Sequence, residues 1–348
     1  FREGKGQKIM LRAMDSAVAG LRAHQNKLDV IGNNIANVNT FGFKSQTYSF
    51  KDAMYQTSST SSGGKQEATG NATIGGANPA QYGYGSLTGS IATDFTSSTP
   101  SYVGGFNANI NGAGFFVTSA SNKELTLDPA NTKTTTAEMK KNNFAYTRVG
   151  QFSVDANGYI VDANHNFVYG FQPDSLTEPT KYGDGGKKLV PLRAPAADNA
   201  GTVALTGTPV FTGFAAQLKS VEIGEDGIIK GIIDNKTPGA GGAPAQVTSV
   251  SVVLGKVAVA TFQNQEGLTK AGNNTFNAGV GDNTGYISAT MPGEGSTPTL
   301  MAGYLEASNV DLAKEFSDMI TAQRGFQANS KIITVSDEVL QELVNMKR

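Results

Sequence analysis

Apolar side chains recur at steps of three and four residues near both ends of the chain, over 11–38 and 312–344. Steps of this size place side chains on one helix face, so each end predicts a long helix with a narrow apolar seam. The seam positions are Met14, Val18, Leu21, Gln25, Leu28, Ile35, Leu312, Phe316, Met319, Gln323, Phe326, Ile333 and Leu340. We expect the two helices to pair as a coiled coil and to contact other copies of the chain through the apolar faces that remain.

Both predicted helices have recognisable ends. Asparagine and glycine crowd together in 33–44, and because both are poor helix formers the first helix should break near 38–42. The stretch from Ser308 to Asp311 resembles a capping box, in which we expect the serine to offer its side-chain oxygen to the first turn of the last helix.

The sequence between the helices reads mainly as β-structure. Strand-turn-strand patterns with Asn-Gly turns at 110–117 and 152–161 predict hairpins. A run of serine, threonine and glycine at 57–64 predicts a loop or hinge. From 173 to 245, prolines and glycine pairs shorten the apolar runs, which predicts a small inserted β domain.

These patterns predict an α+β chain that is mostly β, with nested β domains inserted between the terminal helices. The predicted domains are a non-native or upstream extension at 1–9, a channel-lining helical inner domain of 10–44 with 308–348, a connecting hinge segment at 45–81, a first β domain of 82–172 with 246–307, and an inserted outer β domain at 173–245. We interpret Met10 as the native start. The alternative is that residues 1–9 are left over from the cloning of the gene for expression.

Composition excludes several classes of partner. The chain is 39% hydrophobic but has no apolar run of about 18 residues, so no transmembrane helix and no membrane insertion are expected. Charged residues make up 16% and the net charge is −1, which leaves no basic field for nucleic acid. There is no cysteine, so disulfides and thiolate metal sites are excluded.

Candidate catalytic chemistry is sparse, and we expect neither an enzyme nor a cofactor or metal site. The two histidines, His24 on an exposed helix face and His165 in a turn, are expected to be structural. The run 162–166 imitates the start of a calcium loop but lacks its glycine and distant glutamate, which favours a turn. A polysaccharide-cleaving enzyme would need paired carboxylates, and the candidates are Asp155, Asp162, Glu222 and Asp226. A carbohydrate-binding β protein would leave the matched terminal helices unexplained.

Longer motifs resemble those of bacterial flagellar rod and hook proteins. Residues 33–44 resemble the N-terminal signature of that family, and 306–338 resembles its closing helix. Stretches at 111–117, 146–152 and 261–268 are similar to strands of its first β domain. The motif residues are Asn33, Asn34, Ala36, Asn37, Asn39, Thr40, Gly42, Phe43, Ser308, Asn309, Val310, Gln323 and Arg324.

The resemblance implies a structural subunit of a helical homopolymer, a tube with a central export channel. An inserted outer domain is typical of the hook, so the resemblance favours the curved, flexible, extracellular hook that transmits torque from rod to filament. A distal rod subunit of the basal body is the alternative. Implied partners are further copies of the chain, the rod and hook-filament junction proteins, the hook cap and the type III export apparatus, with export that uses no cleaved signal peptide.

Overall fold

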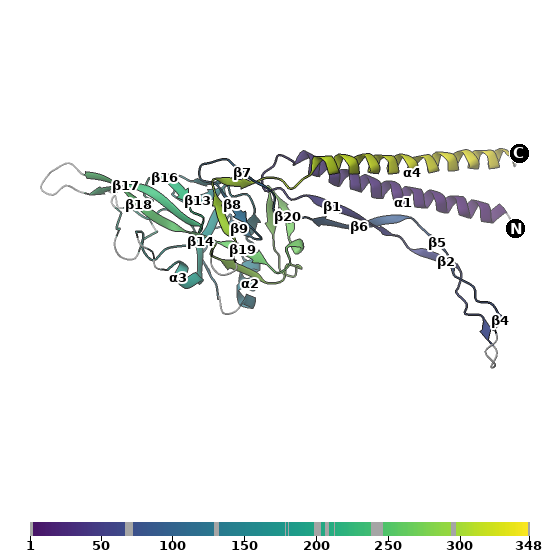
Figure 1. The fold of residues 1–348 in the computed structure, drawn as a ribbon, viewed down its shortest axis with the longest axis horizontal. Coiled ribbons are helices and arrows are strands. Elements are labelled where there is room, and N and C mark those ends of the chain that lie inside the picture. The colour runs from purple at the N-terminus through teal and green to yellow at the C-terminus, as the bar shows by residue number, and fades with distance from the viewer. Residues whose placement is uncertain are drawn as a thin grey trace. The chain divides into compact units, whose positions relative to one another are not determined.

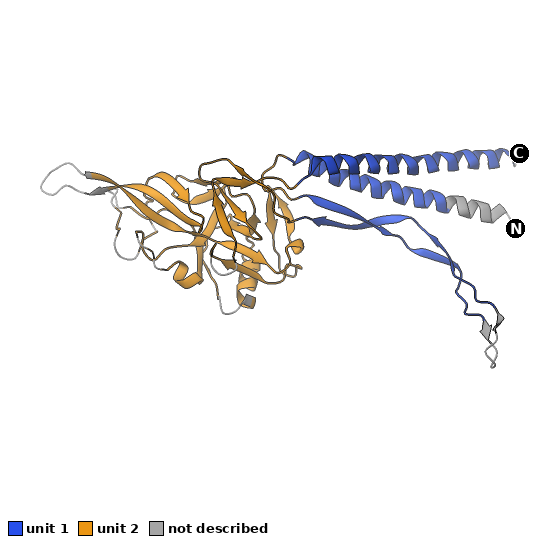
Figure 2. Ribbon diagram, in the orientation of Figure 1, with its two compact units in different colours: residues 1–38, 45–94, 310–348 blue, residues 39–44, 95–309 orange. Residues whose placement is uncertain are grey.

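A computed structural model describes residues 3–66, 72–128, 132–177, 179, 181–197, 203–205, 209–211, 213–237, 246–293 and 297–346. The chain divides into two compact units, coloured blue and orange in Figure 2. Unit 1 comprises residues 1–38, 45–94 and 310–348, and unit 2 comprises residues 39–44 and 95–309. The predicted class, mostly β with a helix at each end, is confirmed.

Unit 1 contains the two long helices, α1 (Glu3–Ala36) and α4 (Leu312–Met346), which lie side by side and antiparallel (Figure 1). Lys27 of α1 forms an ion pair with Asp318 of α4, with 3.1 Å between Nζ and Oδ1. α1 ends at Ala36, two residues before the predicted break, where the asparagine-rich motif begins to turn. No helix of the described residues is long and apolar enough to cross a membrane.

Unit 1 also contains a long β-hairpin in place of the predicted hinge at 45–81. Its ladders pair β1 (Gln46–Asp52) with β6 (Ser86–Thr93), β2 (Tyr55–Ser59) with β5 (Ala80–Gly83), and β3 (Lys65–Gln66) with β4 (Ala72–Ile74). The loop predicted at 57–64 is therefore wrong for 57–59. Polar side chains join the strands there and elsewhere: Gln81 donates to Thr57 Oγ1 at 3.1 Å, and the hydroxyls of Ser49 and Ser90 lie 2.8 Å apart.

Unit 2 is a β-rich body with short helices. Its elements are β7 (Pro100–Tyr102), β8 (Ala108–Asn111), β9 (Phe115–Ser119), β10 (Leu125–Thr126), α2 (Thr132–Lys141), β11 (Ala145–Thr147), β12 (Phe152–Val154), β13 (Ile160–Asp162), β14 (Phe167–Phe171), α3 (Gly183–Gly186), β15 (Lys188–Pro191), β16 (Leu218–Ile223), β17 (Ile228–Thr237), β18 (Gln246–Val257), β19 (Val259–Phe262), η2 (Gln265–Gly267), β20 (Thr269–Gly272), β21 (Thr275–Asn277), β22 (Ile287–Thr290), β23 (Thr299–Ala302) and β24 (Tyr304–Glu306). Fourteen of the strands in the described residues form one hydrogen-bonded network, and its longest path runs β16-β17-β18-β14-β9-β11-β21-β20.

Strand β9 lies at the centre of unit 2 and is buried on both faces. Phe115 and Val117 point into one hydrophobic cluster and Phe116 into the other, as the two-residue period of a strand requires. The hairpin predicted at 152–161 is confirmed, because β12 and β13 pair across a turn at Asn157 and Gly158. The hairpin predicted at 110–117 is wrong, because β8 pairs with β23 while β9 pairs with β11, β14 and β19.

The described residues of 173–245, the range of the predicted inserted domain, pack together with the rest of unit 2. The β17–β18 ladder crosses residue 245, with ten register pairs from Ile228 opposite Lys256 to Thr237 opposite Gln246. Leu192 and Ile229 share one core cluster with Phe116 and Phe152. The prolines and glycines suggested a separate domain, but the apolar residues between them complete the core of unit 2.

Candidate functional site

The predicted seam residues do not all lie in the contact between α1 and α4. Met14, Leu21, Leu28, Ile35, Met319, Ile333 and Leu340 are partly buried, whereas Val18, Gln25, Leu312, Phe316, Gln323 and Phe326 are exposed. Several of the buried positions on these helices carry small side chains, namely Ala17, Ala23, Ala322 and Ser336. A Cβ on Gly20 would lie 2.8 Å from Asn329 Nδ2, which shows how closely the helices approach.

Unit 1 therefore exposes large apolar side chains along α4. Phe316 is 50% exposed and Ile320 is 51% exposed, and further exposed apolar side chains follow to the far end of the helix. Its members are Leu312, Phe316, Ile320, Phe326, Ile332, Val335, Val339, Leu343, Val344 and Met346. Leu312, Phe316 and Ile320 recur every four residues and so lie on one side of the helix, and an exposed apolar patch of this kind marks a site of protein association. The role of the seam residues in assembly stays a prediction.

Asn34 joins three elements of unit 1. Its Nδ2 donates to the carbonyl oxygen of Gln46 at 2.9 Å and to Glu315 Oε1 at 3.1 Å, and its Oδ1 accepts from the amide of Gln46 at 3.0 Å. The side chain is buried, so each polar atom needs these partners. Burial raises the pKa of Glu315, and the hydrogen bond from Asn34 opposes that shift.

His24 is a packing residue, although the sequence placed it on an exposed helix face. Its ring lies 5.3 Å from the ring of Phe50 and faces Gly325, where a Cβ would come within 2.5 Å of the imidazole. Burial, assisted by the nearby charge of Lys27, lowers the pKa of His24. His165 has a φ of 62° and occupies a turn, as predicted.

The loop 39–44, which carries the end of the N-terminal motif, belongs to unit 2. Gly42 has a φ of +67°, and a Cβ there would lie 2.7 Å from Val149 Cγ2. The Gly42 amide donates to the Glu306 carbonyl oxygen at 2.8 Å, and Asn274 Nδ2 donates to the Phe41 carbonyl oxygen at 3.0 Å. Lys270 lies over the buried ring of Phe43, with 4.5 Å between Nζ and the ring centroid. Glycine is therefore required at position 42 by both conformation and space.

A buried ion cluster fixes the end of this loop. Lys44 Nζ lies 2.8 Å from Glu306 Oε1, and Arg148 Nε lies 3.5 Å from Glu306 Oε2. All three side chains are at most 1% exposed. Burial lowers the pKa of Arg148, while the charge of Glu306 acts in the opposite direction. Sequence reasoning missed this cluster, although each of its residues lies in a stretch that resembles the family. The signal that could have found it is that each of these three motifs carries a charged residue, in a chain with few charged residues.

The start of α4 differs from the predicted capping box. Asp311 is the capping residue, because its Oδ1 accepts from the amides of Ala313 at 2.9 Å and Lys314 at 3.4 Å. Ser308 instead accepts a hydrogen bond from Ser98 Oγ through its carbonyl oxygen, and Asn309 Nδ2 donates to Thr96 Oγ1.

The remaining motif residues lie at element ends or on surfaces. Asn37 Nδ2 donates to Asn33, and the Phe43 amide donates to the carbonyl oxygen of Thr40. The others occupy partly buried or exposed positions: Ala36 is the last residue of α1, Asn39 follows that helix, Val310 precedes α4, and Gln323 and Arg324 lie on α4.

The carboxylates that a polysaccharide-cleaving enzyme would need serve turns or are exposed. Asp155 Oδ1 accepts from the amides of Asn157 and Tyr159, and Asp162 Oδ1 accepts from those of Asn164 and Asn166. Glu222 and Asp226 are exposed. No group of three His, Cys, Asp or Glu residues suited to a metal occurs in the part of the chain that the structure describes.

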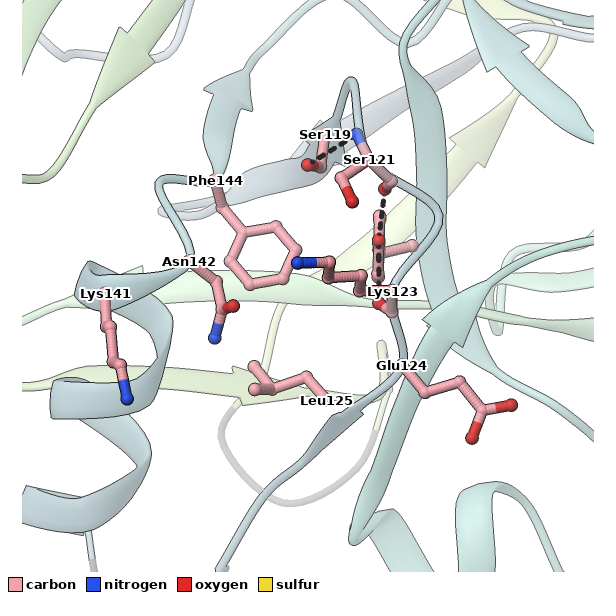
Figure 3. Close-up of a pocket in the computed structure, with 9 residues that line it drawn as sticks. Ser119, Ser121, Lys123, Glu124, Leu125, Lys141, Asn142 and Phe144 are labelled. Atoms are coloured by element: carbon pink, nitrogen blue, oxygen red, sulfur yellow. Dashed lines mark hydrogen bonds between the residues drawn. The ribbon is translucent and has the colours of Figure 1, made fainter.

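One hollow of unit 2, about 210 Å³ in volume, is drawn in Figure 3. Leu125, Phe144 and Tyr169 form its apolar part, and Lys123 reaches across it. The Tyr169 hydroxyl donates to the carbonyl oxygens of Ser121 and Lys123, and burial raises its pKa to about 12. The tyrosine is therefore a fixed structural donor, and the hollow is smaller than most small-molecule sites.

Comparisons with known proteins agree on one family. The model for the flagellar basal body rod FlgEFG protein C-terminal matches residues 301–346, and that for the flagella basal body rod protein matches residues 14–44. The flagellar basal-body rod protein FlgG of Bacillus subtilis is 37% identical over 340 residues, covering 97% of this chain and 100% of the relative.

More distant relatives include both rod and hook proteins. The rod protein FlgG of Caulobacter vibrioides is 29% identical and covers 95% of this chain and 97% of the relative. The flagellar hook protein FlgE of Borreliella burgdorferi is 28% identical over 451 residues, covering 97% of this chain and 100% of the relative. The chain thus belongs to the family of flagellar basal-body rod and hook proteins.

Proposed function

We propose that this chain is a structural subunit of the distal rod of the flagellar basal body. The observation that carries the proposal is the packing of the described residues of 173–245 into the core of unit 2, because a separate outer domain is the reason to expect a hook subunit. The length of the B. subtilis rod protein supports the same choice, since its alignment with this chain spans 340 residues. The hook relative of B. burgdorferi aligns over 451 residues, more than the 348 of this chain, and so has insertions.

A hook subunit is the second candidate. The hook relative covers 97% of this chain, so the two kinds of subunit share its whole architecture. In either case the role is structural rather than catalytic, in keeping with the rod and hook names of the relatives.

Polymerisation would use the apolar face of α4 together with the seam residues of α1. Each large apolar side chain that neighbouring copies bury fully contributes about 1.5–3 kcal/mol. The helices would then form a coiled-coil inner layer around a central channel. The partners would be further copies of this chain, adjoining rod and hook proteins, and the flagellar export apparatus.

Electron microscopy of basal bodies from cells that lack the gene tests the proposal. A distal rod subunit whose gene is missing should leave a shortened rod and no hook, because a hook that joins rod to filament needs the end of the rod for its attachment. A complete rod without a hook would establish the second candidate. Normal rods and hooks would overturn both. Restoration by the intact gene is the control for effects on neighbouring genes.

A further inference from the structure

Three stretches of unit 2 that are distant in sequence meet at Glu306. They are 39–44, 96–99 and 306–309. The Glu306 carboxylate accepts from Lys44 Nζ at 2.8 Å and from the amide of Ser98 at 3.1 Å, while its carbonyl oxygen accepts from the amide of Gly42 at 2.8 Å. Lys44 Nζ also donates to the carbonyl oxygen of Thr96 at 2.7 Å, and the amide of Ala307 donates to that of Thr99.

These stretches are also where the chain enters and leaves unit 2. The unit consists of 39–44 and 95–309, so its segment ends lie in or next to the three stretches. Every covalent connection between the two units therefore leaves unit 2 from one of these three stretches or from the residue next to it. Each of the stretches 39–44 and 96–99 is hydrogen bonded to Glu306, and the third contains it.

The cluster contains two cations for one carboxylate. Lys44 and Arg148 both lie against Glu306, and burial leaves neither of them with access to solvent. Removing one cation leaves a paired, neutral cluster, whereas removing the carboxylate leaves two buried like charges. Breaking a buried ion pair by removing one partner is costly because the other charge stays buried.

We propose that Glu306 is the shared counterion that clamps the three stretches together and fixes the ends of unit 2. Its role is to position the loop 39–44, which carries the end of the N-terminal motif, rather than to fill space. Force that passes along the chain between the units is then distributed over all three stretches. The clamp is a property of the folded monomer, so its test is independent of where the chain acts in the flagellum.

Hydrogen exchange of the full chain, measured by mass spectrometry or NMR, provides the test. The informative amides are those of Gly42, Ser98 and Ala307, one in each stretch. The variants are Glu306→Gln, Lys44→Met, Arg148→Met and the double variants that combine Glu306→Gln with either cation change. Glu124→Gln is the matched control, because Glu124 pairs with Lys188 at 2.9 Å on the surface, where the side chains are 61% and 53% exposed.

In Glu306→Gln we expect all three amides to exchange at least about a hundredfold faster. The single cation variants should show a smaller increase, and the control should show none. The decisive expectation is suppression: each double variant should exchange more slowly than Glu306→Gln alone, because one unpaired cation is gone.

Two results would overturn the proposal. In the first, Glu306→Gln accelerates only Ser98, which would make the carboxylate a local hydrogen-bond acceptor. In the second, the double variants exchange as fast as Glu306→Gln or faster, which would indicate simple loss of packing. If Glu306→Gln fails to fold, the same comparison applies to folding itself: folded double variants support the clamp, and unfolded ones refute it.

Discussion

The side-chain amide of Asn34 exchanges two hydrogen bonds with the backbone of Gln46, as a neighbouring β-strand would. Oδ1 accepts from the Gln46 amide at 3.0 Å, and Nδ2 donates to the Gln46 carbonyl oxygen at 2.9 Å. The same Nδ2 donates to Glu315, so one side chain connects α1, the start of β1 and α4. The motif asparagine therefore joins the parts of unit 1.

Replacing Asn34 with aspartate should destabilise unit 1 by about 2 kcal/mol or more, because the new oxygen would face the Gln46 carbonyl oxygen and the Glu315 carboxylate without a proton to donate. Asn33→Asp is the matched control, since Asn33 is exposed and acts as an acceptor for Asn37. Urea unfolding followed by helical circular dichroism measures both. Equal midpoints for the two variants would contradict the account.

Gly42→Ala should destabilise unit 2 by about 1–3 kcal/mol or more. The positive φ penalises any side chain, and the added Cβ would meet Val149 at 2.7 Å. Gly32→Ala is the control, because a Cβ there meets nothing within 4 Å and should stabilise α1 by about 0.5–1 kcal/mol. Denaturant titration monitored by tyrosine fluorescence should show shifts of opposite sign.

The terminal helices were predictable because their apolar periods are long, but their contact face was not. Periodicity weights large side chains and gives no weight to Gly20 and Gly325, where the two helices approach each other closely while Phe316 stays half exposed. The hairpin was missed for a related reason. Ser and Thr at 57–59 read as loop, yet their hydroxyls and β-branched side chains suit a two-stranded ladder.

The site was predictable only in part. The resemblance identified Asn34 and Gly42, but it could not show that Lys44, Arg148 and Glu306 meet, because 262 residues separate Lys44 from Glu306. Proline and glycine content reports chain irregularity rather than a domain boundary, and β18, one of the two strands that pair with β17, begins only at Gln246.

Stability of unit 1 should fall as the pH drops below about 6.5, because the pKa of His24 in the folded chain lies below its ordinary value of 6.5. The unfolded chain then binds more protons than the folded chain over this window, so acid favours unfolding. His24→Gln should reduce the difference in melting temperature between about pH 8 and about pH 5. An unchanged difference would show that other groups cause the acid sensitivity.

Replacing Phe316 and Ile320 with serine should impair assembly without unfolding the monomer. Both side chains are half exposed in the single chain, so the loss appears mainly when copies associate. The critical concentration for polymerisation should rise about tenfold or more per residue. Phe214→Ser in unit 2, where Phe214 is 78% exposed, is the control and should leave that concentration nearly unchanged. The measurement is the protein concentration that stays in the supernatant after the polymer has been pelleted by centrifugation.

Electron cryomicroscopy of basal bodies isolated from the source organism, at a resolution that traces side chains, tests the central claim most directly. We expect this chain in the straight distal rod, with α1 and α4 innermost and with Phe316 and Ile320 covered by neighbouring copies. Tracing the chain to the curved hook would contradict the rod assignment, and finding these side chains uncovered in the polymer would contradict assembly through the terminal helices.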